Sequence, residues 1–161
     1  MINIVPKPYH AVEKKGSKKL TRESVVYVDS RLKDCISAFS DNFDFIDSGR
    51  YCFDEAGECD IKIDYNPSVK DEGYNIECTP KCLKIEASGY AGLLYAAMSL
   101  KQLAYFQLKG AESEIEIPCL DIQDEPRYGY RGVQLDESRH FFGEENVKRL
   151  LRLMAFYKLN R

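Results

Sequence analysis

The sequence predicts an α+β fold, in which a partly antiparallel sheet is covered by two helices and is followed by one further strand and helix. Short segments alternate polar and apolar residues and are separated by turns, which is typical of half-exposed strands. Two longer segments repeat apolar residues at the spacing of a helix. The 161 residues, 44% hydrophobic and 30% charged, are enough to bury a core. A complete (β/α)₈ barrel is excluded, because it needs ~250 residues.

The first predicted elements are a strand and a helix. Residues 24–29, Ser-Val-Val-Tyr-Val-Asp, are rich in β-branched side chains, which favours a strand. Asp29 is a typical helix N-cap, and apolar residues then recur at helical spacing, which predicts a helix over residues 31–43 with one buried face. Residues 44–57 contain two glycines and several aspartates and are predicted to form a loop. The apolar residues of the helix are Leu32, Cys35, Ile36 and Phe39.

Three short strands are predicted in the middle of the chain. Residues 58–65 alternate strictly between polar and apolar side chains, as a half-exposed strand does. Residues 74–78 and 82–87 alternate in the same way around Pro80, which predicts an antiparallel hairpin. Residues 66–73 carry Pro, Asp and Gly and form the surface linker before that hairpin.

A second helix and a last strand complete the first unit. Residues 90–108 are apolar on almost every side, so we expect a central helix that packs against the sheet. Its tyrosines and methionine are predicted to belong to the core rather than to a ligand site. Residues 114–122 alternate again and predict a last strand that is broken at Pro118. The side chains assigned to the core are Tyr90, Tyr95, Met98 and Tyr105.

The six cysteines are predicted to be reduced thiols. Nothing in the sequence indicates an oxidising compartment, and a chain of this length folds without disulfides. Cys78 and Cys82 flank a predicted turn and are interpreted as half-buried residues rather than as a disulfide. Cys52 and Cys59 are too far apart in sequence for a zinc knuckle, and the chain has only two histidines. We therefore expect no metal site and no cofactor.

Charge and the N-terminal sequence exclude two classes of partner. The chain carries 23 Lys and Arg against 26 Asp and Glu, for a formal net charge of -3, so nucleic-acid binding has no electrostatic basis. Residues 1–5 hold only four apolar side chains before two prolines, too few for a signal peptide or a membrane span. The chain as given is expected to be cytoplasmic and not bound to a membrane, and export of a longer native form stays open.

The last forty residues predict one strand and one helix. Residues 132–136 resemble a strand, and Glu144 opens a helix with apolar residues along one face. Basic residues further along, Lys158 among them, suit the helix dipole. A single strand–helix unit leaves apolar surface uncovered, so the helix is expected to fold back onto the first unit or to form a homodimer. The apolar face consists of Val147, Leu150, Leu151 and Met154.

A resemblance to a known family rests on this C-terminal segment. Residues 126–142, Pro-Arg-Tyr-Gly-Tyr-Arg-Gly-Val-Gln-Leu-Asp-Glu-Ser-Arg-His-Phe-Phe, are similar to the start of the catalytic barrel of glycoside hydrolase family 20, the β-N-acetylhexosaminidases. Residues 1–120 more loosely resemble the α+β domain that precedes that barrel. The resemblance implies a non-catalytic domain over residues 1–122. It also implies that residues 123–161 are the first strand and helix of a truncated (β/α)₈ barrel.

The resemblance implies the function of an N-terminal fragment of a glycosidase. The family removes terminal N-acetylhexosamine from glycans by a substrate-assisted retaining route, in which the acetamido oxygen of the sugar attacks the anomeric carbon. The catalytic Asp–Glu pair of the family lies on a later barrel strand, beyond residue 161, so the fragment is expected to be inactive. Asp136 and Glu137 are not that pair. Asp136 is interpreted as structural and Glu137 as solvated.

One substrate-binding residue is implied by the resemblance. Arg139 matches an arginine that holds hydroxyl groups of the terminal sugar, a task that suits the planar donors of a guanidinium. The alternative is an ion pair between Arg139 and Asp136 or a helix end. His140 is not assigned a catalytic role, because Ser138 and Asp136 crowd the same strand end and have no triad geometry. Arg131 is interpreted as a packing or ion-pair residue.

Two other functions stay open on the sequence alone. The chain also fits a self-contained, non-enzymatic module that binds carbohydrate or another partner. It also fits the leading domain of a different glycosidase family.

Overall fold

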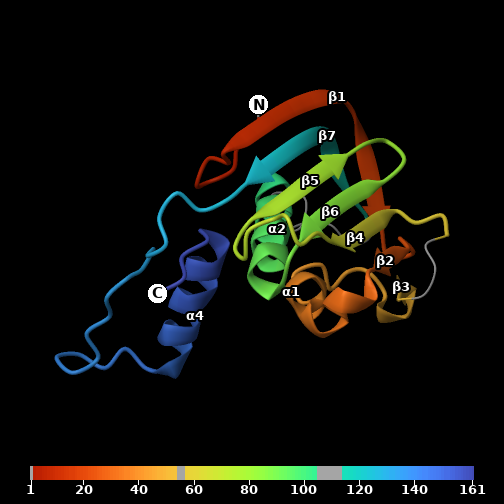
Figure 1. Cartoon of the computed structure of the whole chain (residues 1–161). Helices are drawn as coiled ribbons and strands as arrows, with labels where there is room; N and C mark the ends of the chain where they lie inside the picture. Colours follow the sequence, from red (N-terminus) through yellow and green to blue (C-terminus); the bar gives the residue numbers. More distant parts are fainter. Residues whose placement is uncertain (1, 54–56, 105–113) are drawn as a thin grey trace.

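The computed structural model describes residues 2–53, 57–104 and 114–161. Seven strands form one mixed sheet, with two helical segments against one of its faces, and a third helix stands apart near the C-terminus (Figure 1). The predicted α+β class with a partly antiparallel sheet is therefore confirmed. The strands are β1 (His10–Thr21), β2 (Val26–Val28), β3 (Tyr51–Cys52), β4 (Ile61–Tyr65), β5 (Tyr74–Cys78), β6 (Leu83–Ala87) and β7 (Glu114–Asp124).

The sheet has an antiparallel half and a parallel half. Its strand order is β1-β7-β5-β6-β4-β2-β3. Strands β1, β7, β5 and β6 pair antiparallel, whereas β6, β4, β2 and β3 pair parallel. The predicted hairpin is confirmed as β5 and β6, with Ile76 opposite Ile85. Alternate residues of both strands are buried, so the polar residues between them form the open face of the sheet.

Strand β1 is the longest element that sequence analysis missed. Its lysines hide the alternation, because they lie along the edge of the sheet, where charged side chains deter pairing with another chain. The expected break at Pro118 was wrong. Strand β7 runs through Pro118, and the irregularity lies in β1 between Glu13 and Ser17. Gly16 has φ of 99° in that bulge, a conformation that glycine adopts without strain.

The predicted helix over residues 31–43 was wrong in its regularity. The segment consists of a 3₁₀ turn, Ser30–Cys35, and the short helix α1, Ser37–Ser40. The prediction of Asp29 as the N-cap is confirmed, because its carboxylate accepts a hydrogen bond from the backbone N–H of Arg31 at 3.0 Å. Phe39 and Phe43 stack at 4.6 Å between ring centroids and are fully buried.

Residues 44–53 of the predicted loop contain regular structure. They contain a 3₁₀ turn, Ser48–Arg50, and the strand β3, which pairs with β2. Residues 54–56 of that loop lie outside the described residues. The strand predicted over residues 58–65 begins only at Ile61, where its pairing with β6 starts.

Helix α2 (Tyr90–Leu103) packs against the sheet, as predicted for an apolar helix. Residues 105–108 of the predicted helix lie outside the described residues. The assignment of its tyrosines to the core was right only in part. Tyr90 is 50% exposed, whereas Tyr95 is buried, as is Met98; Tyr105 is not described. Tyr95 also binds polar groups, as shown below.

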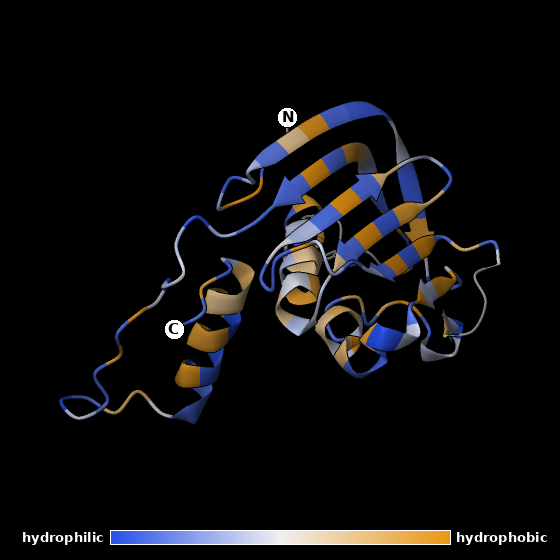
Figure 2. Ribbon diagram, in the orientation of Figure 1, coloured by the Kyte–Doolittle hydropathy of each residue, from blue (hydrophilic) through white to orange (hydrophobic). Residues whose placement is uncertain are grey.

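The C-terminal segment has one helix and no strand. Helix α4 (Glu144–Phe156) follows residues 125–143, which form no helix or strand. The strand predicted over residues 132–136 is therefore absent, since the described chain offers it no neighbouring strand with which to pair. Orange and blue residues lie on different sides of α4 in Figure 2, which confirms its amphipathic character.

Candidate functional site

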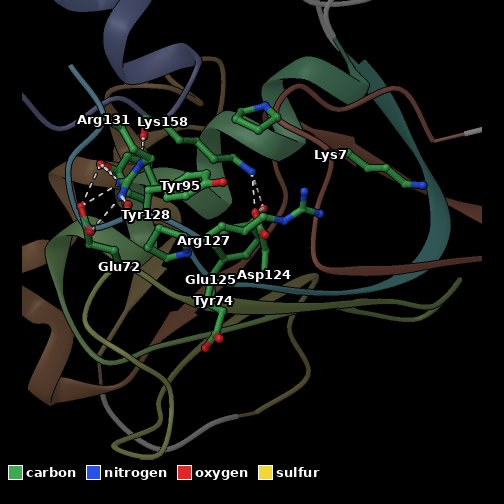
Figure 3. A pocket seen from close by; sticks show the side chains of 12 residues that line it. Lys7, Glu72, Tyr74, Tyr95, Asp124, Glu125, Arg127, Tyr128, Arg131 and Lys158 are labelled. Atoms are coloured by element: carbon green, nitrogen blue, oxygen red, sulfur yellow. Dashed lines mark hydrogen bonds and ion pairs between the residues drawn. The ribbon is translucent and has the colours of Figure 1, made fainter. Parts of the chain in front are cut away.

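A small cavity lies where the C-terminal segment meets the sheet (Figure 3). Its volume is about 230 Å³, and its walls come from the end of β7, the start of β5, helix α2 and the segment after β7. Charged and hydroxyl side chains from these elements bind one another around it. We call this group the junction: Glu72, Tyr74, Tyr95, Asp124, Arg131, Lys158 and Asn160.

Lys158 is the most deeply buried charge of the junction. It follows α4 in a left-handed conformation, with φ of 59°, and only 6% of the residue is exposed. Its ammonium group donates to Asp124 Oδ2 at 2.8 Å and to the Tyr74 hydroxyl at 2.7 Å. The Tyr74 hydroxyl donates to Asp124 Oδ2 at 2.9 Å and lies 2.6 Å from Ser99 Oγ. Every polar atom of this cluster therefore has a partner, which buried polar groups require.

Burial shifts the pKa of two groups in this cluster, Lys158 and Tyr74. Removal from water lowers the pKa of Lys158, although the nearby Asp124 carboxylate partly offsets this effect. Burial and the charge of Asp124 raise the pKa of Tyr74 well above its ordinary value. The Asp124 carboxylate therefore supports the charged form of Lys158 against the effect of burial. The earlier interpretation of Lys158 as a residue that complements the helix dipole was wrong, because its ammonium points into the sheet.

Arg131 makes the second set of contacts in the junction. Its guanidinium donates to both carboxylate oxygens of Glu72, at 3.0 and 3.3 Å, and to the Lys158 backbone carbonyl at 2.9 Å. Burial raises the pKa of Glu72, but hydrogen bonds from Arg131 and Asn160 outweigh this effect and leave that pKa lowered. Tyr95 hydrogen-bonds to Glu72 and to Arg131, each at 3.3 Å. The interpretation of Arg131 as an ion-pair residue is confirmed.

Backbone contacts close the C-terminal segment on itself. The Asn160 N–H donates to the Arg131 carbonyl at 2.7 Å, and the Val133 N–H donates to the Arg161 carbonyl at 3.0 Å. Gly132 is required at this crossing, because a Cβ there would lie 2.6 Å from the Arg161 carbonyl oxygen. Residues 131–133 and 160–161 thus form one unit, which the side chains of the junction bind to the sheet.

Arg139 lies outside the junction, on an exposed turn. Its side chain is 90% exposed and pairs with Asp136, with 2.5 Å between Nε and Oδ2. Asp136 Oδ1 also accepts from the backbone N–H groups of Ser138 and Arg139. Asp136 is structural, as interpreted. The His140 ring packs edge-on against Phe142 at 4.9 Å, and no triad forms with Ser138 and Asp136.

Glu137 was wrongly interpreted as solvated. Its carboxylate accepts a hydrogen bond from the Phe142 backbone N–H at 3.1 Å, and its Oε1 atom is buried without a partner. In the turn over residues 136–142, the carboxylates of Asp136 and Glu137 therefore both accept hydrogen bonds from backbone N–H groups of the same turn.

The junction is arranged to hold segments together. The Asp124 carboxylate is paired with Lys158 and the Glu72 carboxylate with Arg131. In this structure neither carboxylate is free to transfer a proton or attack a substrate. Within the described ranges, no group of three or more His, Cys, Asp or Glu side chains is placed to hold a metal ion. No helix of the described chain has both the length and the apolar character needed to cross a membrane.

Comparison with known families accounts for both parts of the chain. Residues 1–125 match the model described as glycosyl hydrolase family 20, domain 2. The chain belongs to glycoside hydrolase family 20. Residues 128–161 match the model of the catalytic domain of the same family. The resemblance noted from residues 126–142 is thereby confirmed.

Relatives in family 20 are several times longer than this chain. A β-hexosaminidase of Vibrio furnissii is 29% identical over 159 residues, which are 99% of this chain and 25% of that protein. A β-N-acetylhexosaminidase of Cellulomonas fimi is 36% identical over 100 residues, 62% of this chain and 20% of that protein. The chain thus spans about a quarter or less of the length of these two relatives.

Solved structures of family 20 enzymes share the fold. The β-N-acetylhexosaminidase of Bacteroides fragilis superposes with a TM-score of 0.83 at 26% identity, over 98% of this chain and 31% of that one. An exo-β-N-acetylglucosaminidase of Vibrio harveyi, solved with N-acetylglucosamine, gives 0.79 at 28% identity, over 98% of this chain and 24% of that one.

Sequence analysis missed most of the junction. Glu72 was predicted only as a linker residue and Tyr74 only as a strand residue, and Asp124 was given no role, because their partners lie 34 to 88 positions away along the chain. One signal was available. Asp124 is a charged residue at the end of a strand whose alternate residues are buried, where the chain leaves the sheet. A charge at such a position needs a partner.

Proposed function

We propose that this chain is the N-terminal part of a β-N-acetylhexosaminidase and that it positions the start of the catalytic domain. Residues 1–122 are the proposed non-catalytic domain, and residues 123–161 the proposed first strand and helix of a (β/α)₈ barrel. The junction is the observation that carries this proposal. Two buried or half-buried ion pairs of the junction hold residues 131–161 against the sheet. This arrangement fixes the orientation of that segment and leaves no charged group of the two pairs without a partner.

The proposed substrates of the complete enzyme are glycans with terminal N-acetylhexosamine. The names of the relatives support this choice, because they are hexosaminidases from several organisms. The proposed mechanism is the substrate-assisted retaining route of the family, with its Asp–Glu pair outside residues 1–161. Arg139 is the proposed sugar-binding residue, since its exposed guanidinium has donors that Asp136 does not occupy.

Alone, this chain is proposed to be inactive. We expect no hydrolysis of a chromogenic N-acetylglucosaminide by the purified 161-residue chain. Activity that copurifies with the chain and disappears in Arg139→Ala would overturn the proposal. The coding sequence that follows Arg161 is a second test. A reading frame that continues into a second strand and an Asp–Glu pair supports the enzyme, whereas an immediate stop codon supports a self-contained module.

The apolar side of α4 is the proposed contact for the rest of a barrel or, in the chain alone, for a second copy. The helix contacts α2, where Gln102 donates to the Phe156 carbonyl at 2.8 Å. Leu151 is 55% exposed. Sedimentation of the chain is expected to show a dimer that Leu151→Glu converts to a monomer. A wild-type monomer at high concentration would exclude the homodimer.

A further inference from the structure

Four of the six cysteines form two pairs in space that the sequence does not suggest. The Cys82 thiol lies beside Cys59, and the Cys78 thiol lies beside Cys119. Cys78 and Cys82, which flank the hairpin turn, are not each other's partners. The two pairs differ in access to solvent, because Cys78 and Cys119 are buried whereas Cys59 and Cys82 are half-buried.

Cys59 and Cys82 lie at the beginnings of two neighbouring parallel strands. Strands β4 and β6 pair with Ile61 opposite Leu83, and the Leu83 N–H donates to the Asp60 carbonyl at 2.9 Å. Cys82 therefore stands across from Asp60, next to Cys59. Adjacent strands are ~4.8 Å apart and rise ~3.3 Å per residue, so two residues one position out of register on neighbouring strands fall in the ~4.4–6.8 Å range of Cα separations that a disulfide joins.

The same two thiols open onto one surface hollow. Glu58, Asp60 and Lys81 complete its lining, so a small solute can reach both sulfur atoms from one side. The Lys18 ammonium, bound to Asp60 at 2.5 Å, brings a positive charge to this end of the sheet. Lys18 favours the Cys82 thiolate, whereas Asp60 opposes it, and the thiolate is the nucleophile in thiol–disulfide exchange.

We propose that Cys59 and Cys82 form a reactive dithiol that small disulfides of the glutathione type oxidise to an intramolecular disulfide. This site is independent of the proposed glycosidase function. In the first step one protein thiolate attacks the external disulfide, a mixed disulfide forms, and one small thiolate leaves. In the second step the other protein thiolate attacks the mixed disulfide and releases the second small thiolate. Two protein thiols are oxidised, and one external disulfide is reduced to two thiols.

The second step needs the contact between the two sulfurs. Burial, and to a smaller extent the neighbouring Cys59, raises the pKa of Cys82 to about 11. Few Cys82 thiolates therefore exist at neutral pH. A mixed disulfide on Cys59 holds its sulfur beside Cys82, which gives the intramolecular reaction a large advantage in effective concentration. Burial raises the pKa of Cys78 to about 12, and this pair has no access to the hollow. The buried pair is therefore an internal control.

The proposed disulfide would close residues 59–82 into a loop that includes Glu72 and Tyr74 of the junction. A loop of this length is expected to raise Tm by ~5–10 °C, because the cross-link restricts the unfolded chain. Dithiothreitol should return Tm to the value of the reduced chain.

The experiment treats the full 161-residue chain with oxidised glutathione and maps its disulfides by mass spectrometry after proteolysis without reduction. The expected result is a Cys59–Cys82 link and a higher Tm. Cys59→Ser and Cys82→Ser should each stop at a mixed disulfide and gain no Tm. Cys52→Ser, which removes an exposed cysteine outside the pair, should still form the link. The proposal is overturned by separate mixed disulfides on Cys59 and Cys82 without a link, or by a link whose Tm does not rise.

Discussion

The sheet region, residues 2–124, and the C-terminal region, residues 125–161, are held in place by different kinds of contact. In the sheet region alternate residues of the strands and most of α2 are buried in a single apolar core. In the C-terminal region α4 has no fully buried residue, and the segment is fixed by Arg131, Lys158 and Asn160 at the junction. Apolar burial provides the stability of the first region, whereas polar contacts with defined geometry orient the second.

The largest difference is expected from one substitution made in both regions. Leu93→Ala in α2 empties a fully buried site and should lower the free energy of unfolding by ~3–4 kcal/mol. At a concentration where the chain is monomeric, Leu151→Ala in α4, at a side chain that is 55% exposed, should change it by less than ~0.5 kcal/mol. Urea denaturation followed by circular dichroism measures both. Equal losses would show that the two regions share one core.

The second prediction removes the buried charge of the junction. Lys158→Met leaves Asp124 and the Tyr74 hydroxyl without the ammonium that binds them, and we expect a loss of ~2–4 kcal/mol in the stability of the C-terminal region. Hydrogen exchange in α4 should rise strongly, while exchange in β5 and β6 changes little. The matched control is Lys148→Met on α4, where the exposed pair with Glu144 is worth little. Similar exchange in both variants would remove the role given to Lys158.

The third prediction concerns acid and the open face of the sheet. Hydrogen bonds from Lys84, Asn75 and Asn66 outweigh burial and lower the pKa of Glu86 from 4.5 to about 2. The unfolded chain therefore takes up this proton at a higher pH than the folded chain does. The stabilisation is present above pH 4.5 and is lost as the pH falls towards 2.

The measurement is the free energy of unfolding of the wild type and of Glu86→Gln between pH 6 and 2. We expect the wild type to lose about 1 kcal/mol more than the variant over this range, a modest value because Lys84 is partly exposed. The same slope in both proteins would assign the acid sensitivity to other carboxylates.

The smallest effect is expected at Arg139. Its exposed ion pair with Asp136 should contribute less than ~0.5 kcal/mol, so Arg139→Ala should unfold like the wild type. Arg131→Ala is the matched comparison in the same region. It should lower the free energy of unfolding more, since it leaves the half-buried Glu72 without its cationic partner. Thermal unfolding of both variants tests this order. A larger loss for Arg139→Ala would make Arg139 structural and would weaken its proposed role in binding sugar.

Local patterns predicted the strands that have one buried face. β4, β5 and β6 were found because their apolar residues alternate, and α2 was found because it is apolar on most sides. Strand β1 was missed for the opposite reason. It lies at an edge and carries lysines at positions that a central strand fills with apolar residues.

The strand predicted over residues 132–136 shows a further limit of local patterns. Its composition suits a strand, but a strand exists only when another strand supplies hydrogen-bond partners, and none does so within the described part of the chain. The segment over residues 31–43 shows the same limit, because apolar residues at helical spacing are buried there in a 3₁₀ turn and one short helix.

The sequence by itself determined the α+β class, the family, the hairpin and the amphipathic helix α4, because each depends on residues close together along the chain or on a motif read in order. Only the tertiary structure decided which distant side chains meet. Lys158 binds Tyr74 across 84 positions, and Cys82 contacts Cys59 rather than Cys78. The physical reason is that ion pairs and thiol contacts depend on distances of a few ångströms, which strand order and register set and which separation in sequence does not reveal.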